Sequence, residues 1–246
     1  MKKLIIAFLM AAAPLLGMAS GGGAHLDHAD VDLSDQASLQ RGAKYFVNYC
    51  LSCHSAKYQR YNRMAKDIGL TEDEVKDNLM FITDKVGEGM TIAMPAELSG
   101  QWFGNPPPDL SVIARARGAD WIYTYLRSFY LDDSRPFGVN NIVFPDVGMP
   151  HVLWELQGLQ KAVYKTEKDS AGNDAEVFDR FEQVTPGSLS PEEYDEVARD
   201  LTAFLVYIGE PIQMERKRLG VWVLLFIAVF FVFAYLLKKE YWKDVH

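Results

Sequence analysis

The sequence is poor in cysteine and in positive charge, and both shortages narrow its possible functions. Only 2 cysteines occur in 246 residues, so at most one disulfide could form and a disulfide-rich scaffold is excluded. Lys and Arg number 25 against 33 Asp and Glu, which gives a formal net charge of −8. Nucleic-acid binding relies on Lys and Arg to neutralise phosphates, so we expect no nucleic-acid partner. The 49% hydrophobic and 24% charged content also excludes a disordered or fibrous chain.

Two uncharged hydrophobic runs lie at opposite ends of the chain. Residues 4–16 follow Lys2 and Lys3, and small residues surround a cleavage point after Ala19. This run is too short to span a bilayer, and the pattern is that of a cleaved secretory signal over residues 1–19. Residues 219–237 would form a helix about 28 Å long, close to the bilayer core of about 30 Å. Basic clusters at 216–218 and 238–243 flank this run, so it predicts one transmembrane helix.

The segment between these two runs is strongly acidic. Residues 20–215 contain 31 Asp and Glu against 17 Lys and Arg, a net charge near −14. Such a charge repels acidic partners and steers basic ones, although it can equally serve solubility alone.

Periodicity predicts a mainly α domain with long loops. A helix that begins near residue 34 or 38 places Leu39, Ala43, Phe46, Val47 and Cys50 on one face. Further helices are expected over residues 72–86 after a capping box at 71–74, over 110–117, over 121–131 and from Pro191 to about 208. Residues 90–108 and 132–150 are expected to form loops. Residues 162–164 and 177–178 are expected to pair in a small β-hairpin excursion.

Both cysteines lie in Cys50-Leu51-Ser52-Cys53-His54, the C-x-x-C-H attachment pattern of c-type haem. Two thiols three residues apart near a helix end can each form a thioether to a haem vinyl group. The adjacent imidazole is then placed to ligate the iron. A thioredoxin-like redox pair needs a βαβ setting, and a structural zinc site needs four ligands. A disulfide across two residues would be strained, so covalent haem c is the preferred interpretation.

A second axial ligand has several candidates. Met149 lies in a Gly-Met-Pro sequence, where glycine permits close backbone approach and proline stiffens the loop. Met94 is also followed by proline, and His151 could compete as a ligand. His25 and His28 form an H-x-x-H pair, but the sequence offers no further ligands near it.

Together with these features, Asn105-Pro106-Pro107-Pro108-Asp109-Leu110-Ser111 and Ala114-Arg115-Ala116-Arg117 make the chain resemble the cytochrome c1 family. This is the haem subunit family of the ubiquinol–cytochrome c reductase (cytochrome bc1) complex. The resemblance implies one haem c held by Cys50 and Cys53, with His54 and Met149 as the metal ligands. It also implies that Arg117 faces a haem propionate, that Trp121 lies nearby and that the loop containing Pro107 packs along the haem.

The same resemblance implies electron transfer from a Rieske iron–sulfur protein to a c-type cytochrome, with cytochrome b and membrane lipid as further partners. No independent catalytic site is expected. The chain would divide into a signal peptide (1–19), a periplasmic c-type haem domain (20–212) and an anchor with a short cytoplasmic tail (213–246). It would be a single-pass protein of the inner (cytoplasmic) membrane. The alternatives are a tethered c-type cytochrome that feeds a terminal oxidase, and a membrane-anchored thiol-disulfide or metal-binding protein without haem.

Overall fold

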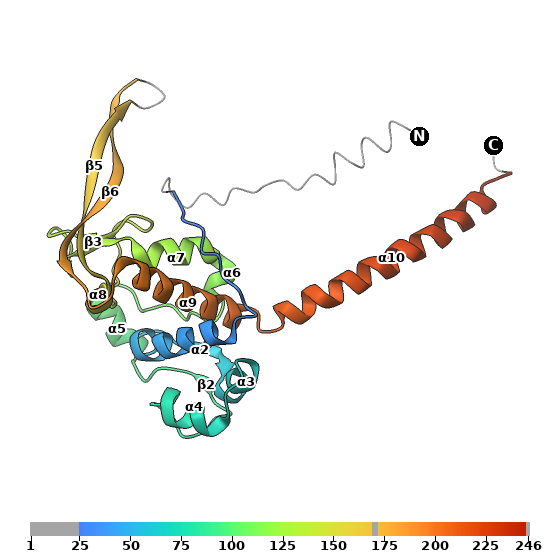
Figure 1. Ribbon diagram of the computed structural model, residues 1–246, viewed down its shortest axis with the longest axis horizontal. Helices are drawn as coiled ribbons and strands as arrows, with labels where there is room; N and C mark the ends of the chain where they lie inside the picture. Colours follow the sequence, from blue (N-terminus) through green and yellow to red (C-terminus); the bar gives the residue numbers. More distant parts are fainter. Residues whose placement is uncertain (1–24, 169–171, 245–246) are drawn as a thin grey trace.

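The computed structural model describes residues 25–168 and 172–244, so the expected signal sequence lies outside the described residues. Helices dominate the regular structure, as the sequence predicts (Figure 1). They are α2 (Gln36–Tyr45), the π-helical turn η1 (Phe46–Cys50), α3 (Tyr61–Asp67), α4 (Glu72–Leu79), α5 (Ala96–Phe103), α6 (Ile113–Arg117), α7 (Ala119–Arg127), α8 (Trp154–Gln157), α9 (Pro191–Gly209) and α10 (Gln213–Tyr241). The strands form three antiparallel pairs: β1 (Ala56–Arg60) with β2 (Gly89–Met90), β3 (Phe129–Leu131) with β4 (Val139–Asn141), and β5 (Gly158–Lys168) with β6 (Asp174–Pro186).

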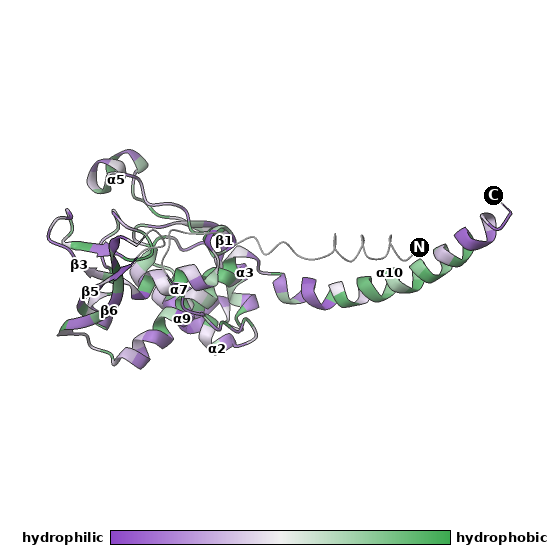
Figure 2. Ribbon diagram, turned by 90° about the horizontal axis from the view of Figure 1, so that it is seen from above, coloured by the Kyte–Doolittle hydropathy of each residue, from purple (hydrophilic) through white to green (hydrophobic). Residues whose placement is uncertain are grey.

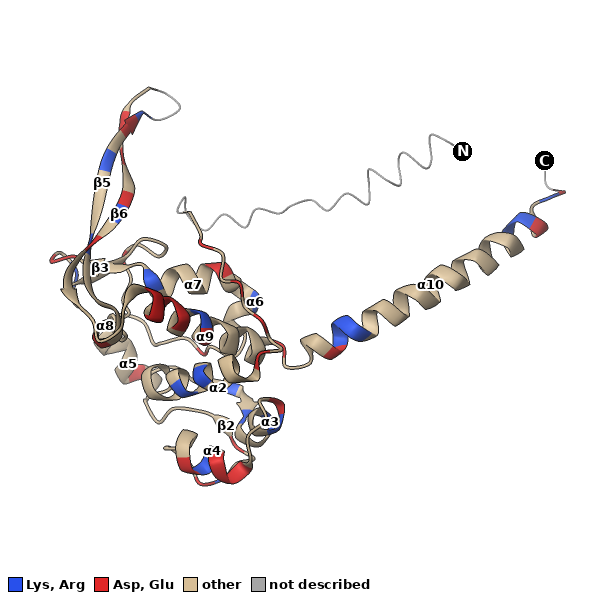
Figure 3. Cartoon of the chain, viewed as in Figure 1, with Lys and Arg blue, Asp and Glu red and all other residues tan. Residues whose placement is uncertain are grey.

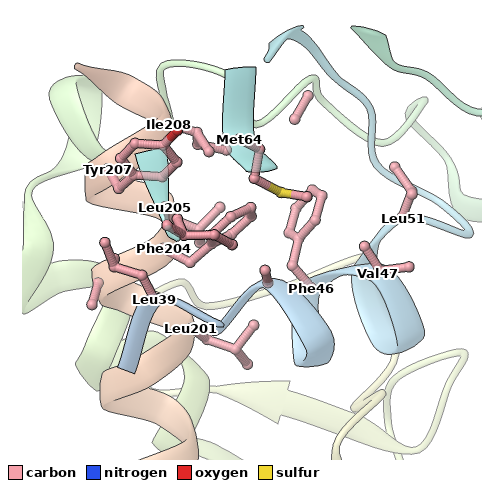
Figure 4. Close-up of a cluster of buried hydrophobic side chains, with 14 of the residues drawn as sticks. Leu39, Phe46, Val47, Leu51, Met64, Leu201, Phe204, Leu205, Tyr207 and Ile208 are labelled. Atoms are coloured by element: carbon pink, nitrogen blue, oxygen red, sulfur yellow. The ribbon is translucent and has the colours of Figure 1, made fainter. Parts of the chain in front are cut away.

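The core forms where α2 crosses α9. Of the apolar face predicted for the first helix, Leu39, Ala43, Phe46 and Val47 are buried and Cys50 is partly buried. These side chains meet the buried apolar residues of α9 in the cluster shown in Figure 4. Gly42 makes this close crossing possible, because a Cβ at this position would lie only 2.1 Å from the Asp200 carbonyl oxygen. Beside the crossing, the buried Asp200 carboxylate accepts hydrogen bonds from Ser38 Oγ at 2.6 Å and Arg41 Nε at 2.6 Å. These hydrogen bonds fix α2 to α9.

The capping box predicted at 71–74 and the helix start predicted at Pro191 are both confirmed. Thr71 caps α4 and exchanges hydrogen bonds with Glu74, and Ser190 caps α9 in the same way with Glu193. These side chains satisfy backbone N–H groups that a helix start leaves without partners. The predicted start of each helix is therefore correct.

Several predicted element ends are wrong, because tertiary pairing takes over from local pattern. The second helix ends at Leu79 rather than 86, since the Val86 carbonyl accepts a hydrogen bond from Asn62 N at 2.8 Å. The expected helix over 121–131 stops at Arg127, where the chain enters β3 and pairs with β4. The expected helix over 110–117 begins only at Ile113.

The expected loop over residues 90–108 contains α5. This helix follows Pro95 and ends at Gly104, whose φ of 81° suits glycine. The expected loop over 132–150 likewise contains β4. Both elements lie in segments whose glycine and proline content indicated irregular structure.

The predicted hairpin is confirmed but is much longer than expected. β5 and β6 are paired from Gly158 with Pro186 to Lys168 with Asp174, and the outer part stands away from the domain (Figure 1). Ion pairs such as Lys161–Glu182 at 3.2 Å join its two strands.

Helix α10 contains the expected transmembrane run and is the one candidate membrane span among the described residues. All of the 18-residue window that qualifies is unburied, so α10 is not a core helix. Its middle is hydrophobic in Figure 2, and Figure 3 places basic residues near both ends.

The N-terminal segment that begins at His25 lies against α7. Ala29 N donates to Asp120 Oδ1 at 2.9 Å, and Asp27 N donates to Thr124 Oγ1 at 2.9 Å. Arg127 on the same helix binds both Asp27 and Asp195, so it joins this segment to α9.

Candidate functional site

The C-x-x-C-H segment follows directly from the helix that packs on α9. The π turn η1 ends at Cys50, and the Cys50 carbonyl accepts hydrogen bonds from Cys53 N at 3.0 Å and His54 N at 2.8 Å. This tight turn brings both thiols and the imidazole to the wall of one cavity. Neither cysteine is in a disulfide, and burial raises the pKa of the Cys50 thiol to about 12.

The cavity has a volume of about 360 Å³ and a mainly apolar wall. Pockets of this character are the usual binding sites of cofactors and small molecules. Besides the motif, the wall is made by Tyr49, Phe103, Asn105, Pro106, Pro107, Pro108, Leu110, Ile113, Arg117, Trp121, Ile122, Tyr125, Leu126, Phe144, Val147, Gly148, Met149, Pro150, Val152, Leu201 and Leu205. All seven site residues predicted from the sequence therefore lie around the same space.

His54 is held by one hydrogen bond. Its Nδ1 lies 2.7 Å from the Pro108 carbonyl oxygen, which can only accept, so Nδ1 carries the proton and Nε2 keeps its lone pair. Burial lowers the pKa of His54, although the Pro108 hydrogen bond and Asp109 oppose this effect. The imidazole is neutral at neutral pH and presents an unprotonated nitrogen, as a metal ligand requires.

The proline loop is itself fastened to the chain that follows the motif. Leu110 N donates to the Ser55 carbonyl at 2.7 Å, Lys57 N to Asp109 Oδ2 at 3.1 Å, and Tyr58 N to Ser111 Oγ at 3.1 Å. These bonds hold the Pro108 carbonyl in place for His54. Pro107 lines the cavity but does not make this contact.

Met149 reaches the same cavity from the loop after β4. Gly148 allows the loop to approach α5, since a Cβ there would lie 2.9 Å from the Phe103 carbonyl oxygen. The Tyr125 hydroxyl donates a hydrogen bond to Met149 Sδ at 3.3 Å. Met94, the alternative ligand, is not among the lining residues.

Arg117 and Trp121 form an aromatic and cationic corner of the cavity. The Arg117 guanidinium carbon lies 4.9 Å from the Trp121 ring centre and 5.8 Å from that of Phe144. Trp121 stacks on Tyr125 with ring centres 4.9 Å apart. Stacking leaves the edge of the guanidinium free to donate hydrogen bonds to an anionic group.

Other predicted ligands do not join the site. His151 is buried, stacks on Phe129 with ring centres 4.9 Å apart and is not among the lining residues. His25 lies near Asp27 and His28 near Asp120, 3.7 and 3.2 Å away. In the part of the chain that the structure describes, no three His, Cys, Asp or Glu residues gather as a metal site.

Sequence reasoning missed three residues that shape the site: Tyr125, Asn141 and Phe103. Asn141 is fully buried, donates to the Tyr125 carbonyl at 2.9 Å and accepts from Val143 N at 2.9 Å. It thus fixes the start of the loop that carries Met149. No spacing rule identifies any of the three, because each acts through contacts between distant segments.

The donor set fits a haem c. Two free thiols, an imidazole with a free Nε2, a thioether and an arginine lie around one apolar cavity. A macrocycle with two vinyl groups, an iron and two propionates needs these groups.

Comparison with known proteins agrees with this chemistry. The model of the "Cytochrome C1 family" matches residues 29–89 and 93–245. A cytochrome c1 of Allochromatium vinosum is 55% identical over 246 residues, covering 100% of both chains. A Nitrosomonas europaea protein named "Ammonia monooxygenase gamma subunit" is 47% identical over 245 residues, covering 100% of this chain and 98% of the relative. A cytochrome c1 of Blastochloris viridis is 29% identical over 287 residues, covering 99% of this chain and 95% of the relative.

Proposed function

The chain belongs to the cytochrome c1 family, and we propose that it carries electrons from a Rieske iron–sulfur protein to a c-type cytochrome. Membership makes it a haem c electron-transport protein of a cytochrome bc1-type complex. The observation that carries the finer proposal is the cavity lined by Cys50, Cys53, His54 and Met149. It contains the groups for a covalent, six-coordinate haem.

We propose that Cys50 and Cys53 hold the haem through two thioethers, with His54 and Met149 as axial ligands. When bound, the haem supplies a one-electron ferric/ferrous couple. His54 is oriented by the Pro108 carbonyl, which also raises the basicity of Nε2. A neutral thioether from Met149 favours ferrous iron and a high reduction potential, as an acceptor from a Rieske centre needs.

The remaining wall residues adjust the same couple. Aromatic, aliphatic and proline side chains make most of the wall, and such apolar surroundings disfavour the more highly charged ferric state. Arg117 lines this wall, and we propose that it neutralises a haem propionate while Trp121 holds its guanidinium in place.

We propose that residues 1–19 are a signal peptide and that 20–212 form a periplasmic haem domain. Residues 213–246 would anchor this domain in the inner membrane, with α10 in contact with lipid and a short cytoplasmic tail. The exposed apolar surface of α10 and the basic residues near both of its ends support this arrangement (Figures 2 and 3). Export is also a condition for c-type haem assembly, which takes place outside the cytoplasm.

The partners can be tested by purifying the detergent-solubilised complex. We expect cytochrome b and a Rieske protein to co-purify with the chain. Recovery with a terminal oxidase, or with the other subunits of a monooxygenase, would contradict the proposal. The name of the Nitrosomonas relative makes this the most discriminating measurement.

The axial ligand can be tested with Met149→Leu, and Met94→Leu is the matched control because Met94 lies outside the cavity wall. Axial ligands set haem potentials over about 0.8 V, so loss of the thioether is expected to lower the potential by about 200 mV. At 59 mV per tenfold change this exceeds a thousandfold change in the ferric/ferrous ratio. The sulfur-to-iron charge-transfer band should disappear in Met149→Leu and persist in Met94→Leu. The reverse pattern would identify Met94 as the ligand.

A further inference from the structure

We propose that Tyr125 is a positioning residue that raises the reduction potential of the haem by donating a hydrogen bond from its hydroxyl to the sulfur of Met149. This inference rests on the proposed role of Met149 as axial ligand and adds a second residue to it. Tyr125 would act through the ligand, without contact to the iron.

The geometry places the hydroxyl with little freedom. Tyr125 Oη lies 3.3 Å from Met149 Sδ. The Tyr125 ring is stacked on Trp121 with an interplanar angle of 11°, and it meets Phe129 edge-on with ring centres 5.1 Å apart. The ring is therefore confined on two sides, and its hydroxyl points at the sulfur.

The backbone at both ends of this contact is also fixed. The Tyr125 carbonyl accepts from Asn141 Nδ2 at 2.9 Å, and the Asn141 side chain accepts from Val143 N and Phe144 N in the loop before Met149. One buried asparagine thus holds the helix that carries the hydroxyl and the loop that carries the sulfur. The donor and the acceptor are set relative to each other by the fold.

A hydrogen bond to a thioether draws electron density from the sulfur lone pairs. A sulfur that also ligates iron is then an even weaker electron donor, which strengthens the preference of the neutral thioether for ferrous iron. The hydrogen bond consequently favours the ferrous state. Sulfur is a weak acceptor, so the effect is expected to be a small part of the contribution of the ligand itself.

The test is a redox titration of the c-type haem in the detergent-solubilised complex with Tyr125→Phe. Phenylalanine keeps the stacking on Trp121 and removes only the donor. We expect the ferric/ferrous ratio at a fixed potential to rise about threefold, a decrease of about 30 mV at 59 mV per tenfold change. The sulfur-to-iron charge-transfer band should remain.

Tyr123→Phe is the matched control, since Tyr123 is buried on the same helix, lies beside the Arg127 guanidinium and does not line the cavity. A Tyr125→Phe potential equal to that of this control, or higher than that of wild type, would overturn the proposal. Loss of the charge-transfer band in Tyr125→Phe would overturn it too, because Tyr125 would then be needed to hold the loop rather than to tune the sulfur.

Two further measurements separate this inference from the ligand assignment. If Met149→Leu keeps the charge-transfer band, the ligand assignment fails and the Tyr125 proposal fails with it. If Met149→Leu loses the band while Tyr125→Phe has the potential of the control, only the Tyr125 proposal fails. Should Tyr125→Phe not assemble, NMR of the reduced wild-type complex decides. A contact between the Tyr125 hydroxyl proton and the Met149 methyl group supports the proposal, and a hydroxyl that exchanges freely with solvent refutes it.

Discussion

Replacing Gly42 by alanine tests whether the close crossing of α2 and α9 sets the shape of the haem cavity. The new Cβ would lie 2.1 Å from the Asp200 carbonyl oxygen and 2.7 Å from Phe204 Cβ, whereas ordinary contact begins at 3.4 Å. The two helices must therefore separate by about 1 Å. A gap of 0.5–1 Å forfeits about a quarter to a half of the dispersion energy between facing atoms.

The expected cost follows from the side chains at this crossing. Leu39, Phe46, Leu201 and Phe204 are all buried there, and each contributes about 2 kcal/mol to stability. Losing a quarter to a half of the combined contribution of these four side chains costs about 3 kcal/mol. The better helix propensity of alanine offsets about 1 kcal/mol of this cost. The net loss of about 2 kcal/mol corresponds to a decrease of about 4–8 °C in the melting temperature.

The assay is thermal unfolding of the solubilised complex, followed at the absorption of the c-type haem. Because Leu201 and Leu205 on α9 line the cavity, the absorption spectrum before melting should change as well. Gly87→Ala is the control, since a Cβ at Gly87 meets no atom within 4 Å. A Gly42→Ala protein that melts with wild type, or above it, would refute the reasoning.

Two other predictions concern the cofactor and its partner. Replacing Cys50 or Cys53 by alanine leaves one thioether at most. The double variant should have the intact mass of the polypeptide without haem and should lose haem-peroxidase staining on a denaturing gel. Retained staining would contradict covalent attachment through these thiols. The charge near −14 of residues 20–215 should steer a basic c-type cytochrome, so the second-order rate of electron transfer should fall steeply as salt rises through about 0.1 M, where the Debye length is about 10 Å. A rate that does not depend on ionic strength would remove electrostatic steering from the proposal.

The elements that could be predicted from the sequence are those specified by local chemistry. The capping residues Thr71 and Ser190 satisfy nearby backbone groups, so their helix starts follow from a few neighbouring residues. The ends of α4 and α7 depend on partners far along the chain, which periodicity does not contain. Asn62 N donates a hydrogen bond to the Val86 carbonyl, and β4 pairs with β3, the strand that follows Arg127.

The candidate site divides in the same way. The C-x-x-C-H segment is specified by its own spacing, and Met149 by its glycine and proline neighbours. Tyr125 and Asn141 act through hydrogen bonds across 24 and 16 positions of the sequence, and nothing in their local pattern marks them. The orienting carbonyl of Pro108 lies 54 positions from His54, although the proline loop was implied by the family resemblance.

The π turn between Tyr45 and Leu51 joins α2, which packs on α9, to the C-x-x-C-H segment. An i→i+5 turn takes in one extra residue, so the residues after it are out of phase with those before it. The turn therefore sets the direction of the Cys50 and Cys53 thiols relative to the apolar face of α2, so packing on α9 and the position of the haem attachment points are fixed by one extra residue.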